Sequence, residues 1–182
     1  MTHIAGVVLA GGQSSRMGTD KSQLTFNNQT LLERTKNLLI QSGIEHIFVS
    51  GPNDIKDKFS NIGPLGGIFS CLTQLKEYDY ILFVPVDMPL LTVKTIEKLI
   101  HRLNLDISHL NKHKFPLIIK NTKEIRNIIK NQITNNALSL YQLFEKLEVN
   151  TIEHCFEKEL FFNTNSPIQW QEAKRRLLSP KQ

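Results

Sequence analysis

The chain has 182 residues, of which 40% are hydrophobic and 21% are charged, and its formal net charge is +5 at pH 7. These proportions are typical of a globular protein, and the length predicts a single domain over residues 1–182 that buries about 70% of its unfolded surface. No apolar stretch approaches the roughly 20 residues that cross a bilayer, so we expect no membrane partner. The basic residues are spread out without interleaved aromatic residues, which suits an anionic small molecule and predicts no nucleic-acid partner.

The cysteine content and the N-terminal residues bear on the compartment. The two cysteines, Cys71 and Cys155, fit no metal-binding spacing and are typical of reduced thiols in the cytosol. An apolar strand pattern begins at His3-Ile4, which leaves no room for a signal or transit peptide. We therefore expect a cytoplasmic protein.

Strand and helix patterns alternate along the N-terminal part of the chain. The strand candidates are apolar runs, as in buried parallel strands, and the helix candidates repeat apolar residues at spacings of three and four. Thr30 and Glu33 predict a capping box, Gly43 a helix end, and Thr92 an N-cap. In chain order we expect a strand Ile4–Leu9, a helix Leu31–Ser42, a strand His46–Ser50, a helix from about Gly66, a strand Tyr80–Val84, and a helix defined by Ile96, Leu99, Ile100 and Leu103.

The C-terminal part continues the pattern with shorter elements. Ser166 and Pro167 predict the N-cap and first residue of a last helix. Before it we expect a strand pair beside the main sheet at Ile107–Leu110 and Phe115–Ile119, a helical face of Leu140, Leu143, Phe144 and Leu147, and a strand Glu148–Ile152. The repeated strand–helix units predict a three-layer α/β/α, Rossmann-like fold with a mostly parallel sheet.

The segment after the first strand has the composition of a phosphate-binding loop. It reads Leu9-Ala10-Gly11-Gly12-Gln13-Ser14-Ser15-Arg16-Met17-Gly18-Thr19-Asp20-Lys21. Glycines let the backbone turn its N–H groups toward an anion, and Lys21 adds a compact positive charge. The segment is neither a Walker loop, because Thr19 stands where the lysine belongs, nor a dinucleotide fingerprint, because Gly11 and Gly12 are adjacent. We expect it to hold a nucleoside triphosphate.

Two further segments lie where an α/β sheet binds its ligands, beyond the carboxyl ends of the strands. Asp87 follows the Tyr80–Val84 strand, and its carboxylate is a hard oxygen ligand suited to Mg²⁺ carried on a triphosphate. The Gly63–Ile68 segment is a rigid turn that enters a helix, whose N-terminal N–H groups can face an anion.

The order of these segments resembles the molybdenum cofactor guanylyltransferase (MobA) family. The resemblance rests on the opening string to Lys21, on Gly63-Pro64-Leu65-Gly66-Gly67, on Asp87-Met88-Pro89 and on Asn163-Thr164-Asn165-Ser166-Pro167. It implies the nucleotidyltransferase version of the fold, in which GMP passes from GTP to the terminal phosphate of molybdopterin and pyrophosphate leaves. It also implies Mg²⁺ as the cofactor and transient contact with proteins that insert the finished cofactor.

The resemblance also implies roles for individual residues. Lys21, Asp87 and Arg16 would be catalytic, with Asp87 and Asn165 as metal ligands and Asn163 and Asn165 on the side of the pterin phosphate. Guanine presents N–H donors, so an acceptor such as Asp57 would read it. The implied GTP-binding residues are Leu9, Ala10, Gly11, Gly12, Lys21, Ser50, Asp57, Gly66 and Asp87.

Two alternative functions stay open at this point. One is the same chemistry with another nucleotide or acceptor, such as cytidylyl transfer to molybdopterin or to a sugar or alcohol phosphate. The other is a nucleotide-binding adaptor without catalysis, which would not need both Lys21 and Asp87.

Overall fold

The computed structural model describes residues 2–10, 20–51, 54–59 and 62–178. At its centre lies a six-stranded sheet in the order β4-β1-β5-β7-β6-β8. Only β7 among these strands runs against the others, since it pairs antiparallel with β5 and β6, whereas β1 pairs parallel with β4 and β5 and β6 pairs parallel with β8. The prediction of a mostly parallel sheet is confirmed. The strands are β1 (Ile4–Leu9), β4 (His46–Ser50), β5 (Tyr80–Pro85), β6 (Ile107–Leu110), β7 (Leu117–Lys120) and β8 (Val149–Ile152).

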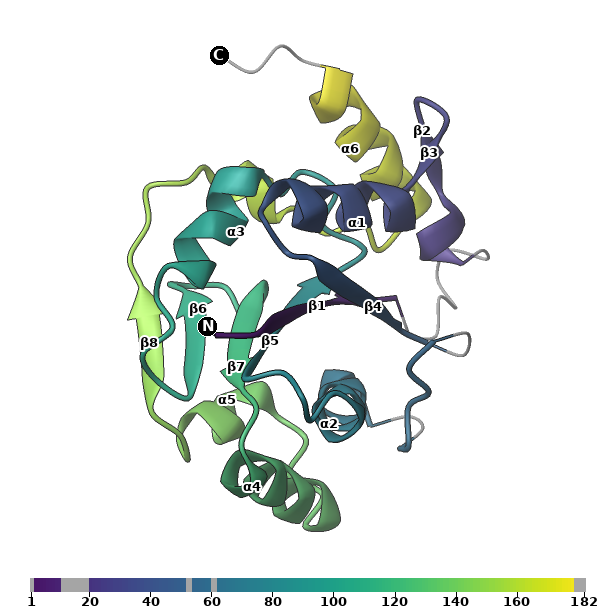
Figure 1. The fold of residues 1–182 in the computed structure, drawn as a ribbon. Helices are drawn as coiled ribbons and strands as arrows, with labels where there is room; N and C mark the ends of the chain where they lie inside the picture. Colours follow the sequence, from purple (N-terminus) through teal and green to yellow (C-terminus); the bar gives the residue numbers. More distant parts are fainter. Residues whose placement is uncertain (1, 11–19, 52–53, 60–61, 179–182) are drawn as a thin grey trace.

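Helices cover both faces of the sheet, which gives the predicted three layers (Figure 1). One face carries α1 (Leu31–Gln41), α3 (Val93–Ile100) and α6 (Pro167–Leu178). The other carries α2 (Pro64–Gln74), α4 (Lys123–Thr134) and α5 (Leu140–Phe144). The remaining elements are a short hairpin of β2 (Thr25–Phe26) and β3 (Gln29–Thr30) and two 3₁₀ turns, η1 (Lys21–Gln23) and η2 (Lys158–Phe161).

Local sequence signals explain the ends of α1 and α6. The Thr30 hydroxyl accepts a hydrogen bond from the Glu33 N–H at 3.1 Å, and the Glu33 carboxylate accepts one from the Thr30 N–H at 2.7 Å. Gly43 follows α1 with a φ of +83°, a conformation that glycine adopts without strain. The Ser166 hydroxyl accepts a hydrogen bond from the Gln169 N–H at the start of α6. The predicted capping box, helix end and last N-cap are confirmed.

Several elements differ from the expectation. No element is expected at α4, although Ile125, Ile129 and Ile133 recur every four residues and are buried. The pair β6 and β7 lies inside the main sheet rather than beside it, because β7 pairs directly with β5. The α3 helix ends at Ile100. Thr92 is its N-cap residue, as predicted, but the Thr92 hydroxyl bonds that of Thr95 and no backbone N–H of the helix.

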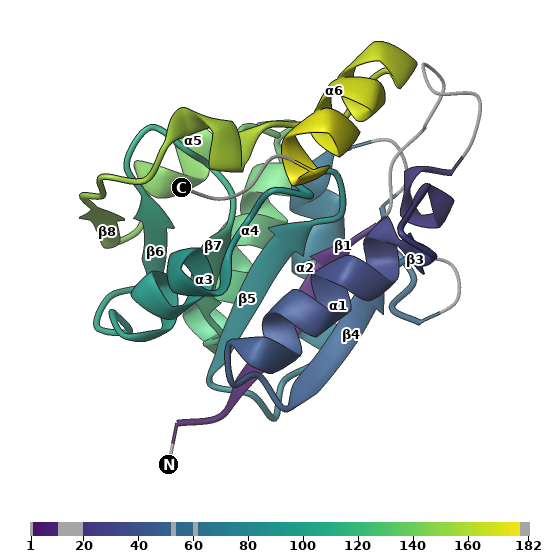
Figure 2. The ribbon, with the colours of Figure 1, turned by 90° about the horizontal axis from the view of Figure 1, so that it is seen from above.

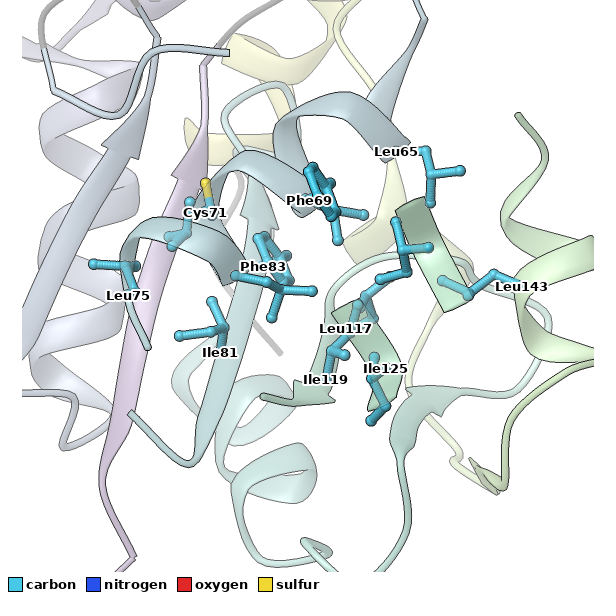
Figure 3. Close-up of a cluster of buried hydrophobic side chains, with 14 of the residues drawn as sticks. Leu65, Phe69, Cys71, Leu75, Ile81, Phe83, Leu117, Ile119, Ile125 and Leu143 are labelled. Atoms are coloured by element: carbon cyan, nitrogen blue, oxygen red, sulfur yellow. The ribbon is translucent and has the colours of Figure 1, made fainter. Parts of the chain in front are cut away.

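The buried residues tie the two halves of the sheet together. Figure 3 shows side chains of α2 and β5, such as Cys71 and Phe83, in one cluster with Leu117 of β7 and Leu143 of α5. Burial raises the pKa of the Cys71 thiol to about 12, although a hydrogen bond to Ser50 lowers it somewhat, so the thiol stays neutral and inert. This cluster holds the β6–β7 hairpin in a fixed position beside β5.

The strand directions set the place of the site. Because β1, β4, β5, β6 and β8 run the same way, their carboxyl ends meet at one edge of the sheet; the arrows of β5 and β6 point to that edge in Figure 2. Within the described residues, no helix is long and apolar enough to cross a membrane.

Candidate active site

The parallel ladder between β1 and β5 carries Asp87 to the carboxyl edge of the sheet. Leu9 pairs with Pro85, and the Val86 N–H donates to the Leu9 carbonyl at 3.1 Å. Asp87 is therefore the second residue beyond β5, directly after the last hydrogen bond of this ladder and beside the end of β1. Its position follows from the strand register and does not depend on a flexible connection.

Lys21 reaches the same edge from η1, whose first residue it is. The carboxylate of Asp20 caps this turn by accepting a hydrogen bond from the Ser22 N–H at 2.9 Å. Ser22 is buried, so the turn is anchored on both sides of Lys21. In the Asp20-Lys21 pair, Asp20 therefore has a structural role as the cap of the turn, and Lys21 has a chemical role as a positive charge.

Three side chains from distant parts of the chain meet at this point, and we call them the Lys21 group: Lys21, Asp87 and Asn165. The Lys21 ammonium lies 3.2 Å from Oδ2 of Asp87 and 2.6 Å from Oδ1 of Asn165. The side chains of Lys21 and Asp87 are 19% and 22% exposed, so the ion pair is shielded from water on most sides but open to a ligand. The contacts therefore join residues from the N-terminal, central and C-terminal parts of the chain.

Thr164 explains why Asn165 reaches this group. Its N–H donates to the Asp87 carbonyl at 2.9 Å and its hydroxyl donates to the same carbonyl at 3.2 Å, and the residue is fully buried. In extended backbone, alternate residues point to the same side, so burial of Thr164 turns Asn163 and Asn165 toward the pocket. Thr164 positions the site and is absent from the sequence-based prediction, although the Asn-x-Asn spacing contains the signal for it.

The Lys21 group lies in a pocket of about 580 Å³. Of the residues predicted to bind substrates, Leu9, Ala10, Lys21, Asp87, Asn163 and Asn165 line it. Its wall also contains the β6–β7 turn Lys112–Phe115, together with Tyr141 and Phe161, which the prediction does not include. This volume falls in the usual range for a small-molecule site.

The oxygen atoms of Asp87 and Asn165 fit a hard divalent cation. Both already contact a positive charge, the Lys21 ammonium, so this pair of donors favours a cation. Among the residues that the structure describes, no three His, Cys, Asp or Glu side chains group to hold a metal ion. Two oxygen donors match the way proteins bind Mg²⁺, with one or two side chains and the remaining ligands from substrate phosphates and water.

A second polar cluster, the Asp57 group, consists of Ser50, Asp57 and Ser70 around Gly67. Oδ1 of Asp57 accepts hydrogen bonds from the Phe59 N–H and the Ser70 hydroxyl, each at 3.0 Å. A Cβ atom on Gly67 would stand 3.1 Å from the Ser50 hydroxyl oxygen and 4.0 Å from Oδ2 of Asp57. A side chain at this position would require the Ser50 hydroxyl to shift by a few tenths of an ångström. The same Cβ would lie 4.0 Å from Leu9, which links the group to the pocket wall.

The structure does not bring all predicted site residues into one pocket. Ser50, Asp57 and Gly66 do not line the pocket that contains Lys21. A Cβ on Gly66 would approach Ile62 to 2.8 Å and the Phe59 carbonyl to 3.0 Å, so packing alone accounts for this glycine. Gly11, Gly12 and Arg16 lie outside the described residues. The roles predicted for all six remain predictions.

The doubly covered, mostly parallel sheet with a cation, a carboxylate and an amide at its carboxyl edge defines a nucleotide-binding α/β protein of the nucleotidyltransferase type. The model of the MobA-like NTP transferase domain matches residues 6–146. The chain belongs to this family.

Relatives share most of their length with this chain. It is 34% identical over 172 residues to the molybdenum cofactor guanylyltransferase of Xanthomonas euvesicatoria pv. vesicatoria, covering 91% of each chain. It is 28% identical over 186 residues to the enzyme of that name from Campylobacter jejuni subsp. doylei, covering 94% of this chain and 95% of the relative.

Solved structures support the fold. Molybdopterin-guanine dinucleotide biosynthesis protein A from Archaeoglobus fulgidus superposes with a TM-score of 0.68 at 18% identity, covering 95% of this chain and 98% of that one. The 4-diphosphocytidyl-2C-methyl-D-erythritol synthase of Anaerococcus prevotii superposes with a TM-score of 0.73 at 13% identity, covering 98% and 99%. Because a protein named for a guanine product and one named for a cytidyl product share this fold, the fold alone does not choose the nucleotide.

Proposed function

We propose that the protein transfers GMP from GTP to the terminal phosphate of molybdopterin, with release of pyrophosphate and with Mg²⁺ as the metal cofactor. The whole chain acts as one nucleotidyltransferase domain in the cytoplasm, and proteins that insert the cofactor receive its product. The observation that carries the proposal is the Lys21 group inside a pocket of substrate size, in a member of the MobA-like family.

The reaction requires no covalent bond between the protein and a substrate. An oxygen of the molybdopterin phosphate forms a bond to the α-phosphorus of GTP, and the bond from that phosphorus to the bridging oxygen of the β-phosphate breaks. The electron pair leaves with pyrophosphate. The nucleophile is already an anion, so no general base is needed, and catalysis consists of positioning and charge stabilisation.

The Lys21 group supplies both the positioning and the charge stabilisation. The Lys21 ammonium neutralises charge on the triphosphate and on the leaving pyrophosphate, as a point charge suited to phosphate. Asp87 and Asn165 would hold Mg²⁺, which when bound neutralises the phosphate oxygens. Thr164 keeps the backbone of Asp87 in place through two hydrogen bonds to its carbonyl.

Lys21 and the metal compete for the same oxygen atoms. The ammonium contacts both Asp87 and Asn165, so it must move toward the phosphates before these oxygens can coordinate a cation. Binding of the metal without nucleotide is then opposed by an internal positive charge. Binding of the triphosphate removes that opposition, because it gives the ammonium another anion to contact.

A nucleotide panel tests the choice of base. We expect GTP with Mg²⁺ to raise the melting temperature more than CTP, ATP or UTP, since ligand binding to the folded state stabilises it. Oδ2 of Asp57 accepts no hydrogen bond from a described residue and suits the N–H donors of guanine. A larger shift with CTP would contradict the guanylyl assignment while leaving nucleotidyl transfer intact.

A further inference from the structure

A second cavity, of about 540 Å³, lies between α1 and the segment that leads from Asp87 into α3. Both helices lie on the same face of the sheet (Figure 1). Met88 lines this cavity and also the pocket of the Lys21 group, so the two adjoin across one short segment of the chain. The volume is in the usual range for a small-molecule site, and the nucleotide chemistry described above uses none of the lining residues.

The charged side chains of this cavity are basic. Arg34 and Lys94 line it, and no described Asp or Glu does. No described carboxylate forms an ion pair with either side chain. Lys94 is exposed, whereas Arg34 is half-buried. Two cations without a counter-ion beside one cavity favour an anionic ligand, above all one with two negative charges.

The Arg34 guanidinium is oriented by one hydrogen bond and keeps its other donors available. Its Nε–H donates to the Pro89 carbonyl at 2.9 Å, and no described residue accepts a hydrogen bond from its two terminal nitrogens. Burial lowers the pKa of Arg34, because partial removal from water disfavours the charged form, and no nearby carboxylate opposes this effect. A guanidinium held in this way is suited to bind a phosphate through two parallel N–H bonds.

Uncharged polar side chains complete the lining. Gln29, Asn37 and Gln41 line the cavity, and no described residue is hydrogen-bonded to their carboxamides. A carboxamide carries N–H donors and an oxygen acceptor, which match the hydroxyl groups of an alcohol. The apolar lining is aliphatic, as at Leu38 and Leu91, and no described aromatic residue offers a flat contact to a heterocycle. The lining therefore favours a hydroxyl-bearing ligand over a nucleobase.

We propose that this cavity is a second ligand site, which binds a phosphorylated polyol such as a sugar phosphate. Arg34 and Lys94 contact the phosphate dianion, and the three carboxamides contact the hydroxyl groups. The hydrogen bond from Arg34 to the Pro89 carbonyl joins the site to the segment that carries Asp87. The proposal does not rest on the proposed function, because the residues of this site take no part in that reaction.

An NMR titration of the backbone amides measures the affinity of a ligand and also locates it. Ribose 5-phosphate carries both phosphate and hydroxyl groups, ribose carries the hydroxyl groups alone, and inorganic phosphate is the anion alone. We expect ribose 5-phosphate to shift the signals of Leu38, Leu91 and Lys94 and to bind at least about tenfold more tightly than either half-probe. The same shifts are expected in Lys21→Met, which lacks the ammonium of the reacting pocket.

Two substitutions in the cavity separate a binding role from a structural one. Lys94→Gln removes an exposed charge that has no described carboxylate partner, so the melting temperature should not change. Arg34→Lys keeps a positive charge but lacks the planar guanidinium fork. We expect each to weaken ribose 5-phosphate binding about tenfold. Lys36→Gln is the matched control, because Lys36 lies on α1 outside the cavity lining, and its affinity should stay within about twofold of wild type.

Four results would overturn the site. The first is the absence of shifts at Leu38, Leu91 and Lys94 when ribose 5-phosphate is added to the wild-type protein. The second is loss of these shifts in Lys21→Met, which would place the phosphate at the Lys21 group. The third is equal affinity for inorganic phosphate, which would leave the carboxamides without a role. The fourth is affinity within about twofold of wild type in both Arg34→Lys and Lys94→Gln.

Discussion

Two carboxylates near the carboxyl edge of the sheet, Asp87 and Asp57, are held in different ways. Asp87 meets Lys21 across 66 residues of sequence, and Lys21 meets Asn165 across 144. Asp57 is held locally, by the N–H of Phe59 and by Ser70 on the first turns of α2. The first arrangement forms only when the whole sheet is assembled, and the second forms within one loop and one helix.

The difference bears on what each carboxylate can do. Asp87 contacts an ammonium group on a flexible four-carbon side chain, and another cation can take its place. One oxygen of Asp57 is already occupied by two donors, which fixes its orientation and leaves the other to accept from a base. We infer that Asp87 serves the reacting phosphates and Asp57 serves recognition, so substitutions in the Lys21 group should cost far more activity.

The largest effect is expected for Asp87→Asn. This change removes the charge that would bind the metal, while the two hydrogen bonds from Thr164 go to the Asp87 carbonyl and survive. We expect kcat for pyrophosphate release to fall by about 10³-fold or more, with a melting temperature near that of wild type. Glu45→Gln serves as control, because Glu45 is exposed and lies before β4 at the opposite edge of the sheet.

Lys21→Met should lower kcat by roughly 10²-fold, because the charge on the leaving pyrophosphate is no longer neutralised. It should also tighten the binding of Mn²⁺ in the absence of nucleotide, measured by electron paramagnetic resonance, since the ammonium no longer contacts Asp87 and Asn165. Lys123→Met on α4 controls for loss of a surface charge. Unchanged or weaker Mn²⁺ binding in Lys21→Met would refute the competition between ammonium and metal.

Asp57→Asn should have a smaller and more selective effect. Loss of a charged acceptor costs about 1.5 kcal/mol per hydrogen bond, so we expect the affinity for GTP to fall roughly tenfold. The affinity for CTP should stay nearly constant, so the preference for GTP narrows. Equal losses for both nucleotides would place Asp57 in the support of the loop rather than in reading the base.

Ser70→Ala should have the smallest effect on binding. The proton of the Ser70 hydroxyl is shared between Oδ1 of Asp57 at 3.0 Å and the Gly66 carbonyl at 2.8 Å, and the hydroxyl accepts a hydrogen bond from the Lys58 N–H at 2.9 Å. We expect the free energy of unfolding to fall by about 1–2 kcal/mol and GTP affinity to fall only a few-fold. Thr73→Ala, one turn further along α2, removes a hydroxyl that bonds only the Phe69 carbonyl and is the matched control.

The sequence is a good guide to the Lys21 group because each member stands at a strand or helix end. Register then fixes Asp87 relative to Leu9, and the capping preference of Asp20 fixes Lys21. The Asn-x-Asn spacing indicates that Thr164 faces away from its two neighbours, but its contacts with Asp87 depend on where the return from β8 passes the end of β5, which the sequence does not show. The antiparallel position of β7 beside β5 could not be predicted either, because the sequence of a short apolar strand does not indicate which strand it pairs with.

The place of Tyr141 in the pocket lining could not be predicted for a related reason. This residue belongs to no local pattern that distinguishes it from other exposed rings. It reaches the pocket only because β6 runs parallel to β5 and α5 packs against the same hairpin (Figure 1). The Asp57 group could be predicted in part, because the sequence shows the carboxylate but does not show its hydrogen-bond partners.

The most direct test incubates the protein with molybdopterin, GTP and Mg²⁺ and follows the product by mass spectrometry beside the pyrophosphate released. We expect one molybdopterin guanine dinucleotide for each pyrophosphate with wild type, and almost none of either with Asp87→Asn that still melts at the wild-type temperature. Dinucleotide formation by Asp87→Asn at a rate close to wild type would contradict the assignment of the reaction to the Lys21 group.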